Sequence, residues 1–457
     1  RYKEGYGISM AGVQSAKNGN IDLVIALDCG VKAIEQSREL KKAAIDLIIC
    51  DHHLPGNNLP TCVALLNPKQ QDCLYPFKDL CGCGIGFKLI QAIGEELELN
   101  QENIFSFLDL TAIATAADLV PMIGENRVIV KLGLELMNSS PRQGVKALLE
   151  TSNKKGELES SDLVFLLAPR INAAGRLAHA SIAVKLLASK AKNDALNFAK
   201  EIEQINSLRK KKDKTITHQA LLLLENDKDK VTSVVCSDEW DKGVVGIVAS
   251  RLIETYYRPT GVLCNAGDFI TGSVRSVKGF NIHEILVEIE DIFERFGGHK
   301  YAAGVTLLPT KLEEFKIRFE EAVKRKITKE ILTQKIYIDA KLSSQDLVRD
   351  KKNNPFPRLY RLVDQLAPFG PGNMKPVFML DNMLDAGNSR VVGETHLKLK
   401  VKEDGGNITF DGIGFGLGHL ASKVKEQSNS FAIAFSMEKN QYNGHTSFQL
   451  RVRDLVF

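Results

Sequence analysis

The chain has 457 residues, of which 44% are hydrophobic and 25% are charged. One hydrophobic core stops growing at roughly 250–300 residues, so this length predicts two or three domains. The composition is that of an ordinary globular protein and excludes disordered, collagen-like and disulfide-scaffold chains. Sixty basic and 56 acidic residues leave a net charge of only +4, so any surface that binds a polyanion must be local.

The eight cysteines do not follow the spacing of a zinc site, because Cys81 and Cys83 form one CxC without a second pair. No stretch of about 18 apolar residues is present, and the first residues lack the basic-then-apolar pattern of a secretory signal. We therefore expect neither a membrane span nor export, and we expect reduced thiols in the cytoplasm.

The first predicted elements form a βαβ unit. Residues 21–27 and 45–50 are short apolar, β-branched runs, and residues 32–44 between them have helical periodicity. Two such strands joined through a helix imply a parallel sheet covered on both faces, with residues 62–66 as a further strand. Asp28 and Asp51 each follow directly after a strand. Both carboxylates therefore fall at the carboxyl edge of the sheet, where open parallel sheets bind their ligands.

A long helix is predicted next, over residues 191–226, with one apolar stripe and a basic run from Arg209 to Lys212. This run could follow a DNA backbone, but a solvated helix face is the favoured reading. A second, smaller α/β domain follows. It contains a strand from residue 231, a helix from residue 243 and a strand pair around residues 262 and 270–276.

Beyond residue 328 the pattern changes to alternating apolar strands separated by Gly, Asn or Asp. The predicted strands cover residues 335–340, 376–382, 396–403, 407–416, 431–440 and 446–457. Five or six strands of this kind suit a small barrel of the OB type. Phe369, Phe410 and Phe415 could stack on nucleic-acid bases there, although core packing accounts for each of them equally well.

Asp51, His52 and His53 form the most informative motif in the chain. A carboxylate and two imidazoles directly after a buried strand require a metal ion or a hydrogen-bond network. An isolated tripeptide of this kind equally fits a turn with two surface histidines. Asp28 in LDCG and Asp118 in TAIATAADLVP also end apolar runs, and they favour the metal site. Mixed carboxylate and imidazole ligands suit Mn²⁺ or Mg²⁺, the ions of phosphoryl chemistry.

These motifs carry a family resemblance. LDCG, DHHLP and the run ending in AADLVP resemble, in order and separation, the second, third and fourth motifs of the DHH phosphoesterases. GSVRSVKGFNIHEIL and FGGHKYAAG resemble the DHH-associated substrate-binding domain. APRINAAGRL and the strand-rich end entered through LAPFGPGNMKPVF resemble the RecJ-type exonucleases.

The resemblance implies an α/β fold class with four parts. They are a parallel-sheet DHH domain over residues 1–190, a connecting helix over 191–228, a smaller α/β DHH-associated domain over 229–327 and an OB-type β-barrel that binds nucleic acid over 328–457.

The resemblance also implies a two-metal site for Mn²⁺ or Mg²⁺. In it Asp28 bridges the ions, and His52 and Asp118 complete the coordination of one of them. Asp51 orients ligands, and His53 lies near the scissile phosphate. No counterpart of the family's first motif, DxD, precedes Asp28. We therefore expect the sequence to begin downstream of that motif and to hold an incomplete dinuclear site.

Residues expected to bind the substrate lie in the downstream motifs, and glycine neighbours there allow close approach of a phosphate. They are Arg170, Asn172, Arg176, Ser273, Arg275, Gly298 and His299. Guanidinium groups bind phosphate through two hydrogen bonds. The alternatives are structural: a salt bridge for any single arginine, an exposed turn for His299 and a strand hydroxyl for Ser273.

The function implied is hydrolysis of single-stranded DNA from 5′ to 3′ in repair and recombination. The same resemblance implies a monomer that works with single-stranded-DNA-binding protein and a helicase. One alternative is a DHH phosphodiesterase for short oligoribonucleotides or cyclic dinucleotides, which the extra strand-rich C-terminus disfavours. Another is an inactive DNA-binding scaffold. That reading is disfavoured because Asp28, His52, His53 and Asp118 are all present.

Overall fold

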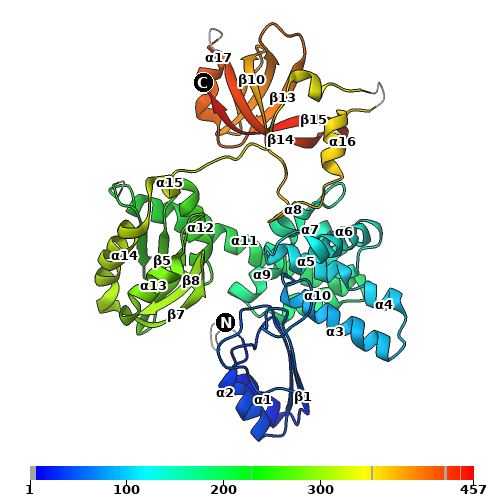
Figure 1. Ribbon diagram of the computed structural model, residues 1–457, viewed down its shortest axis with the longest axis vertical. Coiled ribbons are helices and arrows are strands. Elements are labelled where there is room, and N and C mark those ends of the chain that lie inside the picture. Colours follow the sequence, from blue (N-terminus) through cyan, green and yellow to red (C-terminus); the bar gives the residue numbers. More distant parts are fainter. Residues whose placement is uncertain (1–6, 228, 351–353, 427–429, 443) are drawn as a thin grey trace. The chain divides into compact units, whose positions relative to one another are not determined.

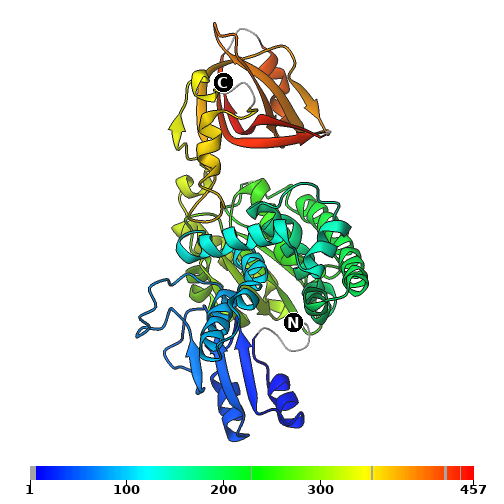
Figure 2. The same ribbon diagram turned by 90° about the vertical axis from the view of Figure 1, so that its right-hand side faces the viewer.

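The computed structural model describes residues 7–227, 229–350, 354–426, 430–442 and 444–457 (Figures 1 and 2). Residues 1–6, at the end of the sequence that lacks the pattern of a secretory signal, lie outside the described residues. The chain forms two compact units. One contains Met137–Glu157 and Asp162–Gln334, and the other contains Gly12–Leu136, Leu158–Ser161 and Lys335–Phe457. None of the described helices is long and apolar enough to cross a bilayer.

The predicted βαβ unit is present at the N-terminal end (dark blue in Figure 1). Strands β1 (Leu23–Leu27), β2 (Asp46–Cys50) and β3 (Ala64–Leu66) are parallel and lie in the order β1-β2-β3. Helix α1 (Met10–Asn18) precedes the sheet, and α2 (Ile34–Lys42) links its first two strands. Leu27 pairs with Cys50, so the residues that follow β1 and β2 emerge side by side at one edge.

Helices continue this part of the chain. They are α3 (Gly82–Glu96), α4 (Gln101–Phe105), α5 (Leu108–Ala117) and α6 (Gly124–Ser139). Helix α3 contacts both β2 and α5, and the buried core between them includes Cys50, Ile85 and Leu108. This packing fixes the carboxyl ends of the strands relative to the C-terminal end of α5.

The other unit is built around the long helix α11 (Lys192–Leu223), which the periodicity predicts. It packs against α7 (Gln143–Thr151), α9 (Ala168–Leu177), α10 (Ser181–Ala188) and α12 (Val245–Tyr256). The short α8 (Ser160–Asp162) and a π-helical turn (Leu163–Leu167) lead into α9. The buried face of α11 is mostly apolar, but Asn206 and Asp213 interrupt it.

The smaller α/β domain contains a five-stranded sheet in the order β4-β5-β6-β8-β7. Its strands are β4 (Ser233–Ser237), β5 (Thr260–Ala266), β6 (Phe269–Arg275), β7 (Phe293–His299) and β8 (Ala302–Leu307). Helices α13 (Ile282–Glu288), α14 (Leu312–Lys326) and α15 (Lys329–Leu332) follow within it. Only β4 and β5 are parallel, and the remaining pairs are antiparallel.

The C-terminal strands form a curled sheet in the order β11-β12-β13-β15-β14-β10-β9, drawn from yellow to red in Figure 2. Their bounds are β9 (Ala340–Lys341), β10 (Phe378–Asp385), β11 (Arg390–Val392), β12 (His396–Glu403), β13 (Thr409–Gly414), β14 (Phe431–Tyr442) and β15 (His445–Val456). An additional pairing between β10 and β12 closes five of them into a ring. Helices α16 (Arg358–Asp364) and α17 (Ala421–Lys425) accompany the sheet.

Two details of the predicted barrel need correction. The strand predicted over residues 335–340 is wrong, because only Ala340 and Lys341 pair, with β10. Strand β11 was not predicted from the sequence. Of the candidate stacking aromatics, Phe410 is buried in the core of this domain, whereas Phe415 is 52% exposed and Phe369 is partly buried against that core.

Candidate metal centre

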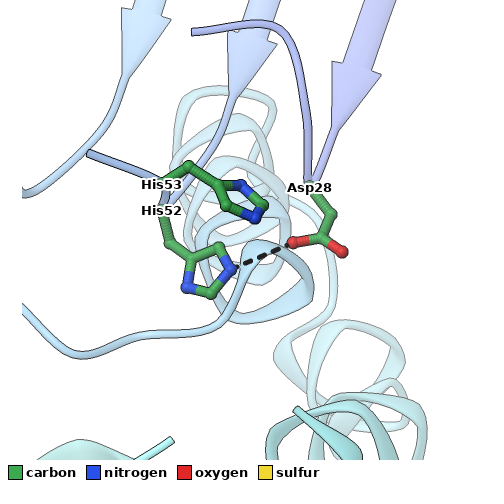
Figure 3. A group of neighbouring side chains, drawn as sticks. All are labelled: Asp28, His52 and His53. Carbon is green, nitrogen blue, oxygen red and sulfur yellow. Dashed lines mark ion pairs between the residues drawn. The ribbon is translucent and has the colours of Figure 1, made fainter. Parts of the chain in front are cut away.

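Three carboxyl and imidazole groups converge at the carboxyl edge of the N-terminal sheet. Asp28 follows β1, His52 lies in the loop after β2, and Asp118 caps the end of α5. The His52 Nε2 atom lies 3.3 Å from Asp28 Oδ1 and 3.4 Å from Asp118 Oδ2. Figure 3 shows Asp28 and His52 pointing toward one another. The sequence thus brings a nitrogen donor between two carboxylates from separate elements.

Asp51 lies beneath this group and organises its loop. Its side chain is 1% exposed and accepts hydrogen bonds from the backbone N–H groups of Val31 (2.9 Å), His52 (2.8 Å) and His53 (3.2 Å). Burial alone would raise the pKa of Asp51. The hydrogen bonds from the His53 ring and from backbone N–H groups more than offset this and lower the pKa to about 2. Asp51 is therefore a charged, inward-facing support for the two histidines.

The His53 ring is held by Asp51 through a contact of 2.7 Å between Nδ1 and Oδ1. This hydrogen bond raises the pKa of His53, although burial opposes it. The His52 and His53 rings meet edge to face with centroids 4.6 Å apart. One donor atom each from Asp28, His52 and His53 lies within 4.8 Å of the other two. The hydrogen bond from Nδ1 to Asp51 fixes the tautomer and the orientation of the His53 ring.

Asn67 completes the loop support, and the sequence reasoning missed it. It is buried, and its Nδ2 donates to the carbonyl oxygen of His53 at 2.8 Å. Its Oδ1 accepts from the backbone N–H of Lys69. Its position in the sequence could have indicated this role, because Asn67 follows β3 just as Asp28 follows β1 and Asp51 follows β2.

The backbone at Asp28 is tightly constrained. Asp28 has φ of 64°, a left-handed conformation that a non-glycine residue adopts only when its surroundings impose it. The first residue of α3, Gly82, lies against it. A Cβ atom at Gly82 would lie 2.4 Å from Asp28 Oδ1. Glycine is therefore required at residue 82 for this approach.

The centre lies beside an apolar cavity of about 400 Å³ formed by β1, α3 and α5, which both Asp28 and Asp118 line. Burial raises the pKa of Asp118; the charge of Asp28 adds to this increase, and His52 opposes it. Two carboxylates that converge on one imidazole at the wall of an apolar cavity are stabilised by a cation. The donor set of oxygen and nitrogen atoms fits Mn²⁺ or Mg²⁺.

Four of the residues predicted to bind substrate are brought together by the second sheet. Arg275 of β6 pairs with Ala302 of β8, which pairs with His299 of β7. Arg275 and His299 therefore lie in one row across three strands. Ser273 and Gly298 lie close to this row, and a Cβ atom at Gly298 would lie 2.3 Å from the Ala302 carbonyl oxygen.

The Arg275 guanidinium is enclosed by this packing. Burial lowers its pKa, and its Nε has no hydrogen-bond partner among the residues that the structure describes. It lies next to Ser273 and to Gly246 of α12, where an added Cβ would be 3.4 Å from Arg275 Nη2. A partly buried guanidinium whose buried Nε has unused donor capacity suits an anionic ligand.

The three residues on α9 that were predicted to bind substrate lie in different environments. Arg170 is buried and pairs with Glu203 through Nε at 2.6 Å, and its Nη1 donates to the Leu166 carbonyl oxygen. Arg176 reaches the Gly243 carbonyl oxygen at 3.2 Å, and Asn172 is exposed. The geometry of Arg170 agrees with the structural alternative, an internal salt bridge, and the phosphate-binding roles of all three residues stay predictions.

Comparison with known proteins relates the whole chain to one family. Residues 4–115 match the DHH family, N-terminal domain; residues 227–325 match the DHHA1 domain; and residues 338–454 match the RecJ OB domain. The sequence is 36% identical over 459 residues to the "Single-stranded-DNA-specific exonuclease RecJ" of Bacillus subtilis. It is 33% identical over 479 residues to the protein of that name from Salmonella typhimurium.

Solved structures agree. RecJ from Thermus thermophilus in complex with Mn²⁺ superposes with a TM-score of 0.81 at 28% identity, over 98% of this chain and 63% of that one. Exonuclease RecJ bound to manganese superposes with a TM-score of 0.61 at 32% identity, over 71% of this chain and 81% of that one.

Coverage differs between these relatives. The alignments include 99% and 100% of this chain, and they span 56% of the length of the Bacillus protein and 81% of the Salmonella protein. Sequence identity above 30% across the whole chain, the three domain matches in order and the structural superposition lead to the same conclusion. The chain belongs to the RecJ family of DHH proteins.

Proposed function

We propose that this chain hydrolyses phosphodiester bonds of single-stranded DNA from the 5′ end, using Mn²⁺ or Mg²⁺ held by Asp28, His52 and Asp118. The observation that carries the proposal is the position of His52 Nε2, 3.3 and 3.4 Å from carboxylate oxygens of two separate elements. The solved relatives that contain Mn²⁺ or Mg²⁺ support the choice of ion.

When bound, such an ion lowers the pKa of a coordinated water and stabilises negative charge on a phosphoryl oxygen. The protein's own residues prepare the site for this chemistry. Asp28 and Asp118 supply oxygen donors within 3.4 Å of His52 Nε2. Asp51 accepts from three backbone N–H groups and so fixes the loop that carries both histidines.

His53 is proposed to contact the scissile phosphate. Its Nδ1–H is donated to Asp51, which orients the ring, and its raised pKa favours the protonated form that attracts an anion. Arg275 is proposed to hold a substrate phosphate, supported by its enclosed guanidinium and by His299 in the same row of the sheet. The small residues Ser273 and Gly298 would allow the DNA strand to approach Arg275 and His299.

We also propose that Asp28 would serve as a ligand to both ions of a two-metal site. Among the described residues, one group of three or more His, Cys, Asp or Glu side chains has metal-binding spacing, and it contains Asp28, His52 and His53. A second ion therefore needs ligands in addition to these and Asp118. The number of Mn²⁺ ions bound per chain, measured by isothermal titration calorimetry, distinguishes one ion from two.

The preference for a single strand is supported by the names of the relatives and by the match to the RecJ OB domain. The 5′ to 3′ polarity rests on the family resemblance alone and stays a prediction. The monomeric state and the action with single-stranded-DNA-binding protein and a helicase rest on the family resemblance alone and stay predictions. The cytoplasmic location, expected from the sequence, also stays a prediction.

The test uses the same single-stranded oligonucleotide with a label at either end, incubated with the chain and Mn²⁺. The proposal predicts immediate release of labelled mononucleotide from the 5′-labelled strand and progressive shortening of the 3′-labelled strand. Consumption of short oligoribonucleotides or cyclic dinucleotides, with DNA left intact, would instead favour the phosphodiesterase alternative.

A further inference from the structure

A second polar site lies on the connecting helix, away from the groups assigned to the metal centre. Asn206 of α11 is 0% exposed, and neither its Nδ2 nor its Oδ1 has a hydrogen-bond partner among the residues that the structure describes. Asp213, the other buried polar residue on this face, is paired with Arg251 at 2.9 Å. Since buried amides are nearly always hydrogen-bonded, the unmatched Asn206 amide indicates a missing ligand.

Asn206 lines a cavity of about 730 Å³ between α9, α11 and α12. This volume is within the range of small-molecule sites. Five cationic side chains line the same cavity: Arg170, Arg209, Lys210, Lys214 and Arg251. Glu203 and Asp213 pair with two of them, Arg170 and Arg251, which leaves an excess of positive charge.

The environment of Arg209 shows that this charge is crowded. Burial lowers its pKa, Asp213 opposes this effect, and the neighbouring guanidinium groups of Arg251 and Arg170 lower the pKa further. Within the described part of the chain, Arg209 Nε is buried without a hydrogen-bond partner. Like charges held together in this way are stabilised by an anion, and guanidinium geometry favours phosphate.

An exposed aromatic ring forms the rim of the cavity. Phe165 is 79% exposed, although its neighbours in the π-helical turn, Leu163 and Leu167, are fully buried. The turn anchors itself through these leucines and directs Phe165 outward into the cavity lining. π-Helical turns of this kind occur at functional sites, and a solvent-facing ring beside cations suits stacking on a nucleobase.

We infer that this cavity is a nucleotide-binding site. Arg209, Lys210 and Lys214 hold the phosphate, and the Asn206 amide supplies a directed donor and acceptor. Phe165 stacks on the base. The nucleotide is either one unit of a single strand or a free mononucleotide. The inference that the nucleotide belongs to a DNA strand rests on the proposed function. The inference that the cavity binds a nucleotide does not.

The test compares two double variants of the full chain, each of which removes two exposed lysines from α11. Lys210→Ala/Lys214→Ala removes cations that line the cavity. Lys200→Ala/Lys211→Ala removes two that line a separate surface of the same helix and is the matched control. Binding of fluorescent (dT)₂₀ is measured by anisotropy in EDTA at 0.15 M salt, so that no strand is hydrolysed. Binding of dTMP is measured by calorimetry.

We expect the cavity variant to bind (dT)₂₀ roughly tenfold more weakly than wild type, because it loses direct contacts with phosphate. The control loses only general positive charge, so its affinity should change by less than about threefold. Phe165→Ala, which leaves the charge unchanged, should also weaken binding. Asn206→Asp, close in shape, should weaken it by repelling phosphate. Circular dichroism checks that each variant folds.

Wild-type binding of dTMP that is lost in the cavity variant identifies a free nucleotide as a ligand. Loss of (dT)₂₀ binding without any dTMP binding identifies the strand. Equal weakening by the cavity and control variants, with Phe165→Ala unchanged, would overturn the inference. Because the assay contains no metal, its failure leaves Mn²⁺-dependent hydrolysis untouched, and a failure of hydrolysis leaves this binding result standing.

Discussion

Replacing Gly82 with alanine tests whether the position of Asp28 determines metal affinity. Within a helix, Gly→Ala ordinarily stabilises by roughly 0.5–1 kcal/mol. At Gly82 the added Cβ would lie 2.4 Å from Asp28 Oδ1 and 2.5 Å from Asp28 Cα. Because a backbone atom is involved, side-chain rotation cannot relieve the clash. Such overpacking costs about 1–3 kcal/mol, so we expect a net loss of about 1–2 kcal/mol in the free energy of unfolding.

The same displacement should weaken Mn²⁺ binding by roughly 10- to 100-fold, as the loss of groups that orient metal ligands does. Urea denaturation gives the change in the free energy of unfolding, and titration calorimetry gives the Mn²⁺ affinity. Gly84→Ala, two residues along α3, is the control, since its nearest neighbour would be Leu80 Cδ2 at an ordinary 3.4 Å. The reasoning is refuted if Gly82→Ala binds Mn²⁺ as tightly as Gly84→Ala.

Three further changes have distinct expected results. Asp51, with its pKa lowered from 3.8 to about 2, contributes roughly 2 kcal/mol of stability above about pH 4 that is lost as pH falls toward 2. Asp51→Asn should therefore lower the free energy of unfolding of the metal-free protein at pH 7 and reduce its loss between about pH 4 and pH 2. If urea titrations show the same pH dependence of the free energy of unfolding as in the wild type, this prediction is contradicted. Asn67→Ala removes the donor to the His53 carbonyl oxygen, so Mn²⁺ affinity measured by calorimetry should fall several-fold. An unaltered Mn²⁺ affinity would contradict this role of Asn67. Arg275→Ala should weaken binding of single-stranded DNA, measured by anisotropy in EDTA, while Mn²⁺ affinity stays at the wild-type value; unchanged DNA binding at moderate salt would remove its phosphate role.

Much of the fold could be predicted because its strands carry a clear pattern. Residues 21–27 and 45–50 are nearly continuous apolar runs, as expected for parallel strands, and they form β1 and β2. The prediction that both faces of the sheet are covered is wrong at β1, because Leu23, Ile25 and Leu27 are exposed. The sequence pattern did not predict the strands correctly where strand formation depends on pairing with a neighbouring strand. Residues 335–340 alternate like a strand, but only their end meets β10. Strand β7 contains the polar, glycine-rich end of FERFGGH, and only its register with β8 makes it a strand.

The candidate metal centre could be predicted in part for the same reason. Asp28 and Asp51 follow predicted strands, and the edge of a parallel sheet brings such residues together. Asn67 was missed although the strand before it was predicted, because an amide after a strand is a weaker sign of a metal site than a carboxylate or an imidazole. The contact between Gly82 and Asp28 arises from the packing of α3 against the sheet. The Asn206 cavity likewise depends on how three helices meet, and neither feature leaves a local sequence pattern.

The most direct test of the central claim is the rate at which end-labelled single-stranded DNA is shortened by the wild type and by His52→Ala, each with Mn²⁺ and with EDTA. Because His52 Nε2 lies between the Asp28 and Asp118 carboxylates, its loss should abolish metal-dependent hydrolysis while the fold is retained. We predict shortening only by the wild type with Mn²⁺. Turnover by His52→Ala close to that of the wild type, or shortening that persists in EDTA, would contradict the account.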